Sequence, residues 1–454
     1  FTYKNTYAMT LPGFRPEVGD MFGQKKHGGF LAPGMDFAFG FTGDDYIDRA
    51  LQNDWLICND SVVSPASSNA LEDLQLRISL EPIRDLKIDL TANRTRNRSR
   101  EIQYMFEGMP DTRSGNFSMS IISIGSAFER PSAGDGYHSG TFERFRRNLD
   151  VIRDRVESQF LGAQYPQGST LAGKAFDPAN GTISKHSPDV MIPAFLAAYT
   201  GKSARNSALD FFPSLFSMMP NWRITYTGLT KIAWFKKNFR SVNLNHAYRS
   251  TYSVGSYNTF QSFMSYMGDI GFVEDVQSGN PIPSSRFDIS MVSINEQFSP
   301  LIGMDATLKN GLTAKVEYKT SRILNLSMSA CQLVETASRD FVIGLGYKIV
   351  NFNLFSARNV KDSKNRVSHD LALRADISFR NQSALCRDIQ QGFAQATNGN
   401  KALKISCSAD YTLSRLLTLR LYYDRQQNTP LVSSSSYPVV SADFGFSMKF
   451  SLTR

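Results

Sequence analysis

The chain has 454 residues, long enough for two or three ordinary domains or for one large β-structure. Its mean hydropathy of −0.28, without any long apolar run, argues against a protein that crosses a membrane with helices. The net charge of +9 comes from 50 Lys and Arg interspersed with 41 Asp and Glu, which argues against a nucleic-acid-binding protein.

Residues 1–128 predict barrel strands interrupted by a helical loop. Strand-like segments lie near 1–10 and 34–41, and a helical pattern runs from Asp44 to Leu56. Apolar and polar residues then alternate from Leu74 to Ala92 around a short turn, while the Ser-rich stretch from Ser64 to Ser68 predicts a mobile loop. Arginines prolong the second of these strands, so we expect it to continue beyond a bilayer into water: Arg94, Arg96, Arg98 and Arg100.

Residues 129–221 are too many for a loop without structure of its own. A charged helical pattern extends from Thr141 to Phe160. A more apolar one extends from Ser187 to Thr200 and opens on Ser-Pro, a common start of a helix. We expect this insertion to pack on or in the barrel, on a side of the membrane that the sequence leaves open.

Residues 222–454 predict further barrel strands up to a closing strand. Ten or so further segments with the same alternation bring the expected total to about fifteen strands. Connections at 253–285, 381–401 and 426–439 are rich in Ser, Asn, Gln and Gly and predict long loops, whereas Tyr411 to Ser414 predicts a tight turn. Lys309-Asn310-Gly311 fits either a turn or a bulge.

The alternation has a charged face and an aromatic or aliphatic face. A charge facing lipid at the bilayer midplane costs about 2–4 kcal/mol, so the charged face must line an aqueous lumen if the strands cross a membrane. In a soluble sandwich the same charges would face solvent. The number of strands favours a barrel, because open sheets beyond about ten strands tend to curl or split. The predicted fold class is therefore an all-β transmembrane antiparallel β-barrel, present in part, with inserted helical elements.

Two sets of residues follow from this interpretation. The predicted lumen-facing residues are Lys315, Glu317, Lys319, Arg374, Asp376, Arg380, Arg420, Asp424, Asp443 and Lys449. The predicted lipid-facing residues are Leu371, Leu373, Ile377, Phe379, Leu417, Leu419, Leu421, Phe444, Phe446 and Phe450.

A third set combines aromatic and basic residues at one place in the chain. Rings sit at headgroup level and cations meet lipid phosphates at a membrane surface. The cluster Trp234, Phe235, Lys236 and Lys237 therefore predicts an interfacial segment, with a solvated turn as the alternative. Gly344 and Gly346 on the lumen side predict either close approach of an inserted element or a site that eases curvature.

Catalytic and metal-binding patterns are not found. Ser184, His186, Ser187 and Asp189 are too close in sequence for a nucleophilic triad and are better explained by a loop and a helix cap. The five histidines are scattered, and the four cysteines show neither CxxC spacing nor a histidine partner. Cys407 is expected to be an inert packed thiol, and disulfide pairing stays open. We predict no enzymatic activity, cofactor or metal.

Longer segments carry a resemblance to a known family. The chain resembles the C-terminal part of the SprA/Sov family, the outer-membrane translocon of the type IX secretion system in Bacteroidota. The similar segments lie in order over nearly the whole chain: Leu11-Pro-Gly-Phe-Arg-Pro16, Asp189-Val-Met-Ile-Pro-Ala-Phe-Leu-Ala-Ala-Tyr-Thr-Gly201, Asn221-Trp-Arg-Ile-Thr-Tyr-Thr-Gly-Leu229, Tyr248-Arg-Ser-Thr-Tyr252, Phe298-Ser-Pro-Leu-Ile-Gly303, Leu308-Lys-Asn-Gly-Leu-Thr-Ala314, Phe341-Val-Ile-Gly-Leu-Gly-Tyr347, Gln427-Asn-Thr-Pro430, Tyr437-Pro438 and Phe450-Ser-Leu-Thr-Arg454.

The resemblance implies a portion of a much larger barrel with a protein-sized lumen, in the outer membrane of a Bacteroidota-type bacterium. It also implies export of folded cargo proteins with C-terminal sorting domains. The implied partners are a shuttle barrel, a plug protein, the cargo and outer-membrane lipid, without nucleic acid. The segments are structural, so the resemblance assigns no functional point residue. The chain begins at Phe1 without an export signal, in keeping with an expected piece of a longer protein.

Two other functions are compatible with a barrel. One is the C-terminal barrel of a TonB-dependent-type nutrient transporter, whose plug domain would be encoded upstream. The other is an outer-membrane barrel enzyme, which would need a Ser/His/Asp constellation on its strands that we do not find.

Overall fold

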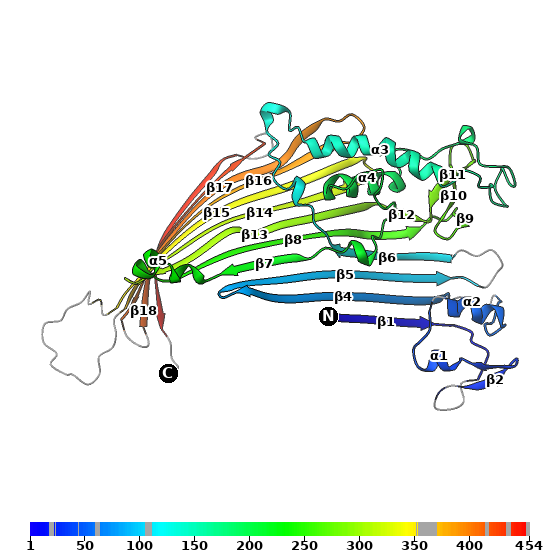
Figure 1. Cartoon of the computed structure of the whole chain (residues 1–454), viewed down its shortest axis with the longest axis horizontal. Helices are drawn as coiled ribbons and strands as arrows, with labels where there is room; N and C mark the ends of the chain where they lie inside the picture. Colours follow the sequence, from blue (N-terminus) through cyan, green and yellow to red (C-terminus); the bar gives the residue numbers. More distant parts are fainter. Residues whose placement is uncertain are drawn as a thin grey trace.

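The computed structural model describes residues 1–17, 22, 24–43, 45–59, 64–104, 111–350, 352, 370–413, 417–432 and 437–450, and its main body is a single curved sheet (Figure 1). The sheet has 14 strands, and every pair in it is antiparallel. Twelve of them follow one another in the order β1 (Thr2–Thr10), β4 (Ala66–Ile83), β5 (Leu86–Ile102), β6 (Asp111–Ser120), β8 (Phe239–Thr259), β13 (Met291–Leu308), β14 (Leu312–Ser327), β15 (Gln332–Ile349), β16 (Leu371–Asp388), β17 (Ala394–Thr412), β18 (Leu417–Pro430) and β19 (Val439–Phe450).

Short strands complete the β-structure. Strand β7 (Asn221–Tyr226) lies between β5 and β8 beyond the end of β6 and pairs with both. Strand β12 (Phe287–Ile289) pairs with β8. Two small sheets lie apart from the main one. They are formed by β2 (Lys25–His27) with β3 (Phe30–Ala32), and by β9 (Met264–Met267), β10 (Ile270–Glu274) and β11 (Pro281–Ser285).

Tight turns join most neighbouring strands. The turn between β13 and β14 contains Lys309, Asn310 and Gly311, and Gly311 has φ 89°, where a side chain would be strained. This segment is therefore a turn and not a bulge. The β4–β5 turn places Asp85 at φ 70°, a conformation that Asp tolerates better than most residues.

The longer helices occupy the regions that the sequence predicts, whereas short helices also occur elsewhere. The insertion contains α3 (Gly140–Ser158) and α4 (Pro188–Thr200), and α2 (Asp45–Gln52) lies within the predicted 44–56 segment, whose first residue is outside the described part. The short helices are α1 (Met35–Ala38), α5 (Ala233–Asn238), η1 (Ile124–Ser126), η2 (Ala133–Asp135), η3 (Pro178–Asn180), η4 (Leu215–Ser217) and η5 (Gly228–Lys231). No helix in the described ranges is long and apolar enough to cross a membrane.

Several predicted loop boundaries are wrong. The predicted loop 381–401 belongs largely to β16 and β17, β8 to β11 occupy much of 253–285, and β18 extends into 426–439. In β16, β17 and β18 the apolar alternation weakens in these stretches, so the side-chain pattern fades while the backbone ladder continues. Asn381, for example, still pairs with Arg339 and Lys401.

Other local predictions also differ. The segment near 34–41 contains α1 instead of a strand, and Ser67 and Ser68 of the predicted mobile loop belong to β4, where Ser68 is buried. In the predicted turn at 411–414, β17 continues to Thr412. Ser414 and the Ser-rich stretch 433–436 lie outside the described residues.

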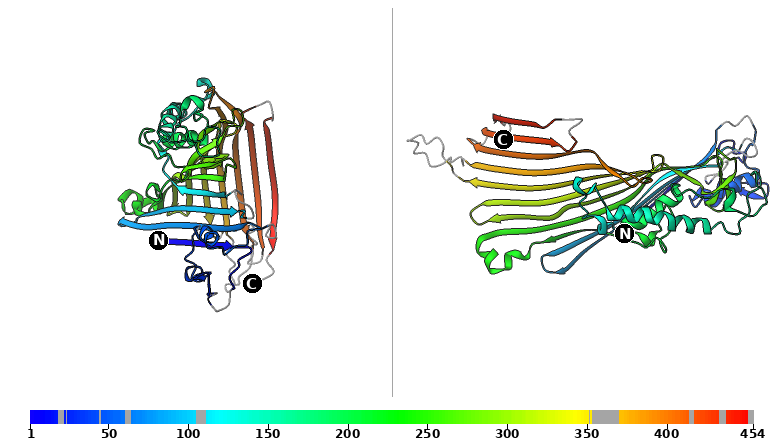
Figure 2. Two further views of the ribbon diagram at one scale, coloured as in Figure 1. Left: turned by 90° about the vertical axis from the view of Figure 1, so that its right-hand side faces the viewer. Right: turned by 90° about the horizontal axis from the view of Figure 1, so that it is seen from above.

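The apolar core lies between the helices and one face of the sheet. Side chains of α3 and α4 pack against β6, β8, β13 and β14, as Phe145, Ile152 and Phe195 meet Phe117 and Ile294 in one buried cluster. A second cluster joins α2 to the ends of β4 and β5. Apart from η5 and α5, the helices gather toward one end of the strands (Figure 2). The fold is all-β and antiparallel with inserted helical elements, which confirms the predicted fold class.

Candidate functional site: a sheet with two different faces

Strand register places the predicted charged residues on one face of the sheet. Lys315 pairs with Gly344, which pairs with Asp376, and Asp376 pairs with Ser406 and through it with Asp424. Directly paired residues of antiparallel strands point to the same side. The same reasoning, applied along each strand, puts all the predicted lumen-facing residues on this polar face.

Ion pairs on the polar face run along strands and between neighbours. Glu317 accepts from Lys315 at 3.0 Å and from Lys319 at 2.9 Å, and Arg380 contacts Asp340 at 2.9 Å. Arg420 lies 3.7 Å from Asp410. The polar face therefore carries charges of both signs, several of which form ion pairs.

The two glycines of β15 make room for neighbouring side chains. A Cβ at Gly344 would lie 2.6 Å from Asp376 Oδ1, and one at Gly346 would lie 2.6 Å from Thr313 Oγ1. The atoms nearest to both positions belong to β14 and β16 and not to an inserted segment. A larger residue at Gly344 would displace the Asp376 carboxylate.

The predicted lipid-facing residues share the opposite, apolar face. Phe341 pairs with Phe379, Leu373 with Tyr347, and Tyr423 with Phe444 across successive strands. Phe444 and Phe446 are 73% and 59% exposed, more than rings in a packed core or on an ordinary soluble surface would be. Leu373, Phe379, Leu421 and Phe450 are also exposed, whereas Leu371, Ile377, Leu417 and Leu419 are half-buried between their neighbours.

These side chains form a continuous band that we call the apolar band. It runs from Leu86, Ile88 and Leu90 of β5 through Ile224 of β7 and on to the aromatic residues of β19. On β16 it extends from Leu371 to Phe379, about 27 Å at the usual rise per residue of a strand. Bands about 25 Å tall are typical of strands that cross an outer membrane.

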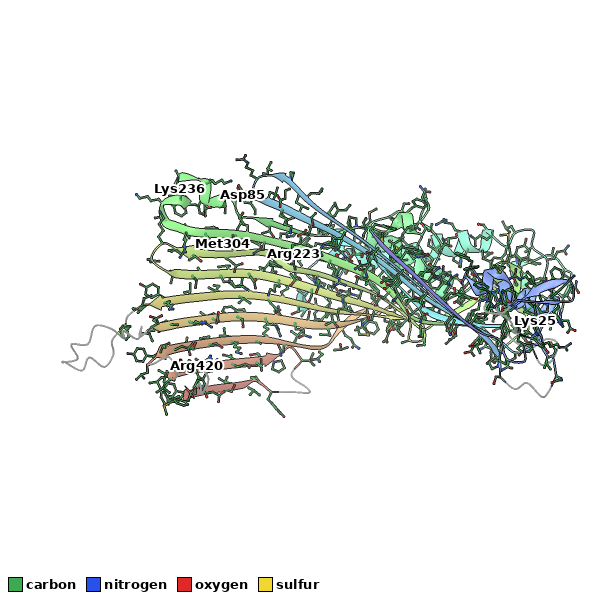
Figure 3. The ribbon with its side chains drawn as sticks, turned by 90° about the horizontal axis from the view of Figure 1, so that it is seen from below. Lys25, Asp85, Arg223, Lys236, Met304 and Arg420 are labelled. Carbon is green, nitrogen blue, oxygen red and sulfur yellow. The ribbon has the colours of Figure 1, made fainter. Side chains whose placement is uncertain are left out.

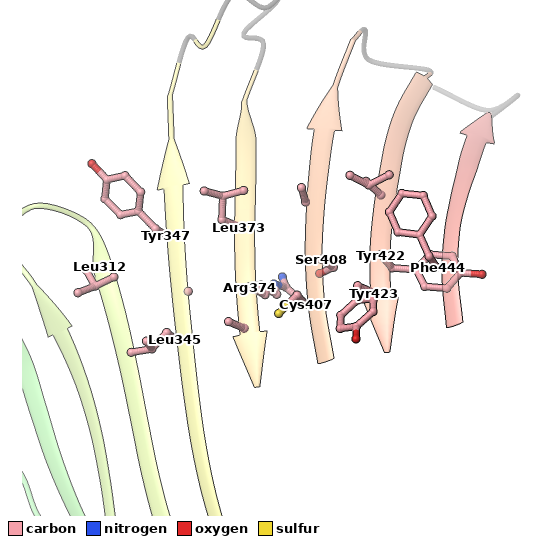
Figure 4. Close-up of a pocket in the computed structure, with 14 residues that line it drawn as sticks. Leu312, Leu345, Tyr347, Leu373, Arg374, Cys407, Ser408, Tyr422, Tyr423 and Phe444 are labelled. Carbon is pink, nitrogen blue, oxygen red and sulfur yellow. The ribbon is translucent and has the colours of Figure 1, made fainter. Parts of the chain in front are cut away.

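The surface of the band is uneven (Figure 4). Small residues at Ala375, Cys407 and Ala409 leave a depression of about 330 Å³ between larger ones such as Leu345, Leu373 and Tyr423. The Cys407 thiol is exposed there, so the prediction of a packed thiol is wrong. All four cysteines are free.

The aromatic and basic cluster lies at one end of the sheet. Lys236 and Asp85 are at the strand ends opposite the end where Lys25 lies (Figure 3). Trp234 of α5 is 62% exposed and packs edge-on against Phe235 at 4.9 Å between ring centroids. The segment is a short, exposed helix between β7 and β8, so interfacial contact and a solvated connection both stay predictions.

Where the helices cover the apolar face, it carries buried charges that the sequence analysis did not predict. Glu296 of β13 and Arg322 of β14 form an ion pair at 2.7 Å, and both are buried. Glu296 also accepts hydrogen bonds from Tyr248 and Ser123, and Arg322 donates to the carbonyl of Ser126 in η1 at 2.6 Å. The pair thereby attaches the start of the insertion to the sheet.

A second pair attaches α3. Glu335 of β15 and Arg387 of β16 lie 3.0 Å apart, and Arg387 is only 1% exposed. The Arg387 guanidinium donates to the Tyr137 carbonyl at 2.6 Å and lies over the Phe142 ring at 5.5 Å. The signal for both pairs was present in the sequence, because Arg322 and Glu335 interrupt otherwise apolar faces.

Glu129 organises the start of α3. Its carboxylate accepts hydrogen bonds from the Thr141 hydroxyl and backbone at 2.6 and 2.9 Å and from Ser139, whose hydroxyl in turn caps α3. Burial alone would raise the pKa of Glu129, but these hydrogen bonds hold the pKa below its usual value. Because the folded-state pKa is lowered, the stabilisation is present above the ordinary Glu pKa and is lost as the pH falls through the folded value.

Glu129→Gln should therefore destabilise the insertion by about 1–2 kcal/mol at neutral pH, the usual cost of losing charge-assisted hydrogen bonds. Hydrogen exchange of the α3 amides measures the effect. The difference from wild type should disappear in acid, where the Glu129 side chain and the glutamine that replaces it are both neutral. Glu143→Gln serves as the control, because it removes a carboxylate of α3 that pairs with Arg146 near the surface. An effect that persists unchanged in acid would contradict the role of the charge.

Asp189 and Ser187 lie apart from any catalytic arrangement. Ser187 is the N-cap residue of α4, although its side chain makes no capping hydrogen bond, and buried Asp189 accepts from the Ser285 backbone at 3.2 Å. Burial raises the pKa of Asp189. Within the described ranges, no three potential ligands gather as they would at a metal site.

Comparisons with known proteins add little. No protein-family model and no curated protein matches the chain. Among solved structures it is similar to in-vitro folded OmpT, an outer membrane protein of Vibrio cholerae, with 8% identity and a TM-score of 0.21 over 85% of this chain and 89% of that chain. A likeness of this degree supports no functional argument, so the functional interpretation depends on the two faces of the sheet.

Proposed function

We propose that the chain forms part of the wall of a protein-conducting outer-membrane channel similar to the SprA/Sov translocons of type IX secretion. The proposal depends on one observation: the sheet has the apolar band on one face and the polar face on the other. Lipid contacts the first and water the second in a transmembrane barrel. The chain would act without enzymatic activity or cofactor.

The open form of the sheet supports a wide lumen. In the described residues, the strand order begins with β1 and ends with β19, and no pairing joins the two. Barrel diameter grows roughly in proportion to strand number, so a wall that is still open after this many strands belongs to a pore wider than a barrel closed by these strands alone.

The polar face also suits the passage of folded proteins. Glu317 pairs with both Lys315 and Lys319, and Arg380 pairs with Asp340. A surface with mixed and locally paired charges exerts no strong field of one sign and holds no particular cargo. Conduction would then be passive, with gating by a plug protein and delivery through a shuttle barrel.

Deletion of the complete gene tests this proposal. Proteins with C-terminal sorting domains should accumulate in the periplasm and disappear from the cell surface, and the complete gene supplied in trans should restore them. Fractionation and surface proteolysis measure the distribution. Normal surface display in the deletion strain would refute secretion as the function, and a nutrient-uptake defect in its place would favour the transporter alternative.

A further inference from the structure

The insertion contains an apolar cavity beside the apolar band. The cavity has a volume of about 300 Å³ and lies between the end of β6, the second half of α4 and the segment 202–219. Met119, Ile121 and Ala197 in its lining are almost fully buried, and Leu196 adds a fourth apolar side chain. It is at the small end of ligand pockets, suited to one slender apolar group.

The cavity lies close to the edge of the apolar band and on the same face. Met119 pairs with Arg94 of β5, four residues beyond Leu90 of the band. Met219 lines the cavity opposite α4, and its amide donates to the Ser120 carbonyl at 3.1 Å. Three residues later, Trp222 pairs with Leu90 of the band. A group in the cavity is therefore separated from the band by about 10–14 Å of strand.

The segment at the mouth is itself apolar and exposed. Phe216 of η4 is 96% exposed and Leu215 is 45% exposed, and Ser217 and Met219 next to them line the cavity. The mouth of the cavity is therefore bordered by a segment that exposes apolar side chains.

The rim carries one charge of each sign. Lys202 and Asp210 both line the cavity, and neither forms an ion pair with another residue in the part of the chain that the structure describes. A zwitterionic headgroup offers a phosphate for the lysine and an ammonium for the aspartate. A headgroup with several phosphates would meet the Asp210 carboxylate unfavourably.

We propose that this cavity binds one acyl chain of a zwitterionic phospholipid, with its phosphate at Lys202 and its amine at Asp210. The inference rests on the proposed membrane location of the band. The bound lipid would hold the insertion against the adjoining leaflet, and its acyl chain would pack against the apolar lining of the cavity.

Native mass spectrometry tests the site. The protein is reconstituted into nanodiscs of phosphatidylethanolamine with a minority of phosphatidylglycerol and then released into detergent. Wild type should keep one phosphatidylethanolamine per chain. Ala208→Trp, which fills the mouth from an exposed position, should reduce retention several-fold, and Lys202→Glu should reduce it as well, whereas Ala179→Trp on the same insertion should not.

Equal retention by wild type and Ala208→Trp would overturn the inference, as would retention of phosphatidylglycerol in preference to phosphatidylethanolamine. Incorporation into the nanodisc is scored separately. Protein that incorporates normally but retains no lipid refutes the cavity alone, while protein that does not incorporate refutes the membrane location and, with it, both proposals.

Discussion

Phe379→Arg and Leu421→Arg should each sharply reduce the amount of protein assembled in the membrane, whereas Arg374→Leu should be tolerated. Phe379 and Leu421 lie in the apolar band and are about half exposed, so an arginine there would face hydrocarbon. The expected cost is about 2–4 kcal/mol for each arginine near the midplane. Arg374 lies on the polar face, so Arg374→Leu would remove a solvated charge and place a leucine in contact with water.

Heat-modifiable mobility and protease resistance of the membrane fraction measure assembly. Phe379→Leu is the matched control, because it changes the size of the side chain at the same place without adding a charge. Equal tolerance of all the substitutions would contradict the lipid-facing assignment. Equal sensitivity at Arg374 would contradict the aqueous assignment of the polar face.

Arg387→Ala should release α3 from the sheet. The substitution leaves Glu335 buried without its cation and removes the guanidinium from the Tyr137 carbonyl and the Phe142 ring. Breaking a buried ion pair from one side typically costs about 3–5 kcal/mol. Limited proteolysis within 129–221 should become much faster, while the strands of the apolar band stay protected.

Two variants make this result specific. The double variant Arg387→Met with Glu335→Leu removes both charges together and should restore most of the protection, because no unpaired charge remains. Arg144→Ala removes an exposed arginine from α3 and should have little effect. Fast proteolysis of the double variant would show that the hydrogen bond to Tyr137, and not charge pairing, fastens the helix.

The alternation of side chains was sufficient to predict the faces of the strands. From Leu371 to Phe379 the period of two is unbroken, and the register confirms that the charged and apolar sets lie on opposite faces. Which face meets lipid stays a prediction. The helices of the insertion were predictable from their own patterns, the charged one from Thr141 to Phe160 and the more apolar one that opens on Ser187-Pro188.

The extent of the strands and the placement of the insertion were not predictable. Beyond Asn381 the faces of β16 mix polar residues with apolar ones such as buried Leu385, so the period of two is lost although the backbone remains paired as far as Asp388. The contacts of Arg322 with Ser126 and of Arg387 with Tyr137 join residues far apart in sequence. Contacts of this kind depend on how the chain folds in three dimensions, which local patterns do not encode.

The packing of α2, α3 and α4 has a consequence for how the proposed channel would be closed. All three cover the same face as the apolar band, so none of them narrows the opposite side. The width of the proposed channel would then depend on the number of strands in its wall and not on these helices. A protein that closes the proposed channel would bind the polar face, where Lys315 and Lys319 already pair with Glu317. Arg374 and Asp424, by contrast, form no ion pair within the described residues and would be free to contact such a protein.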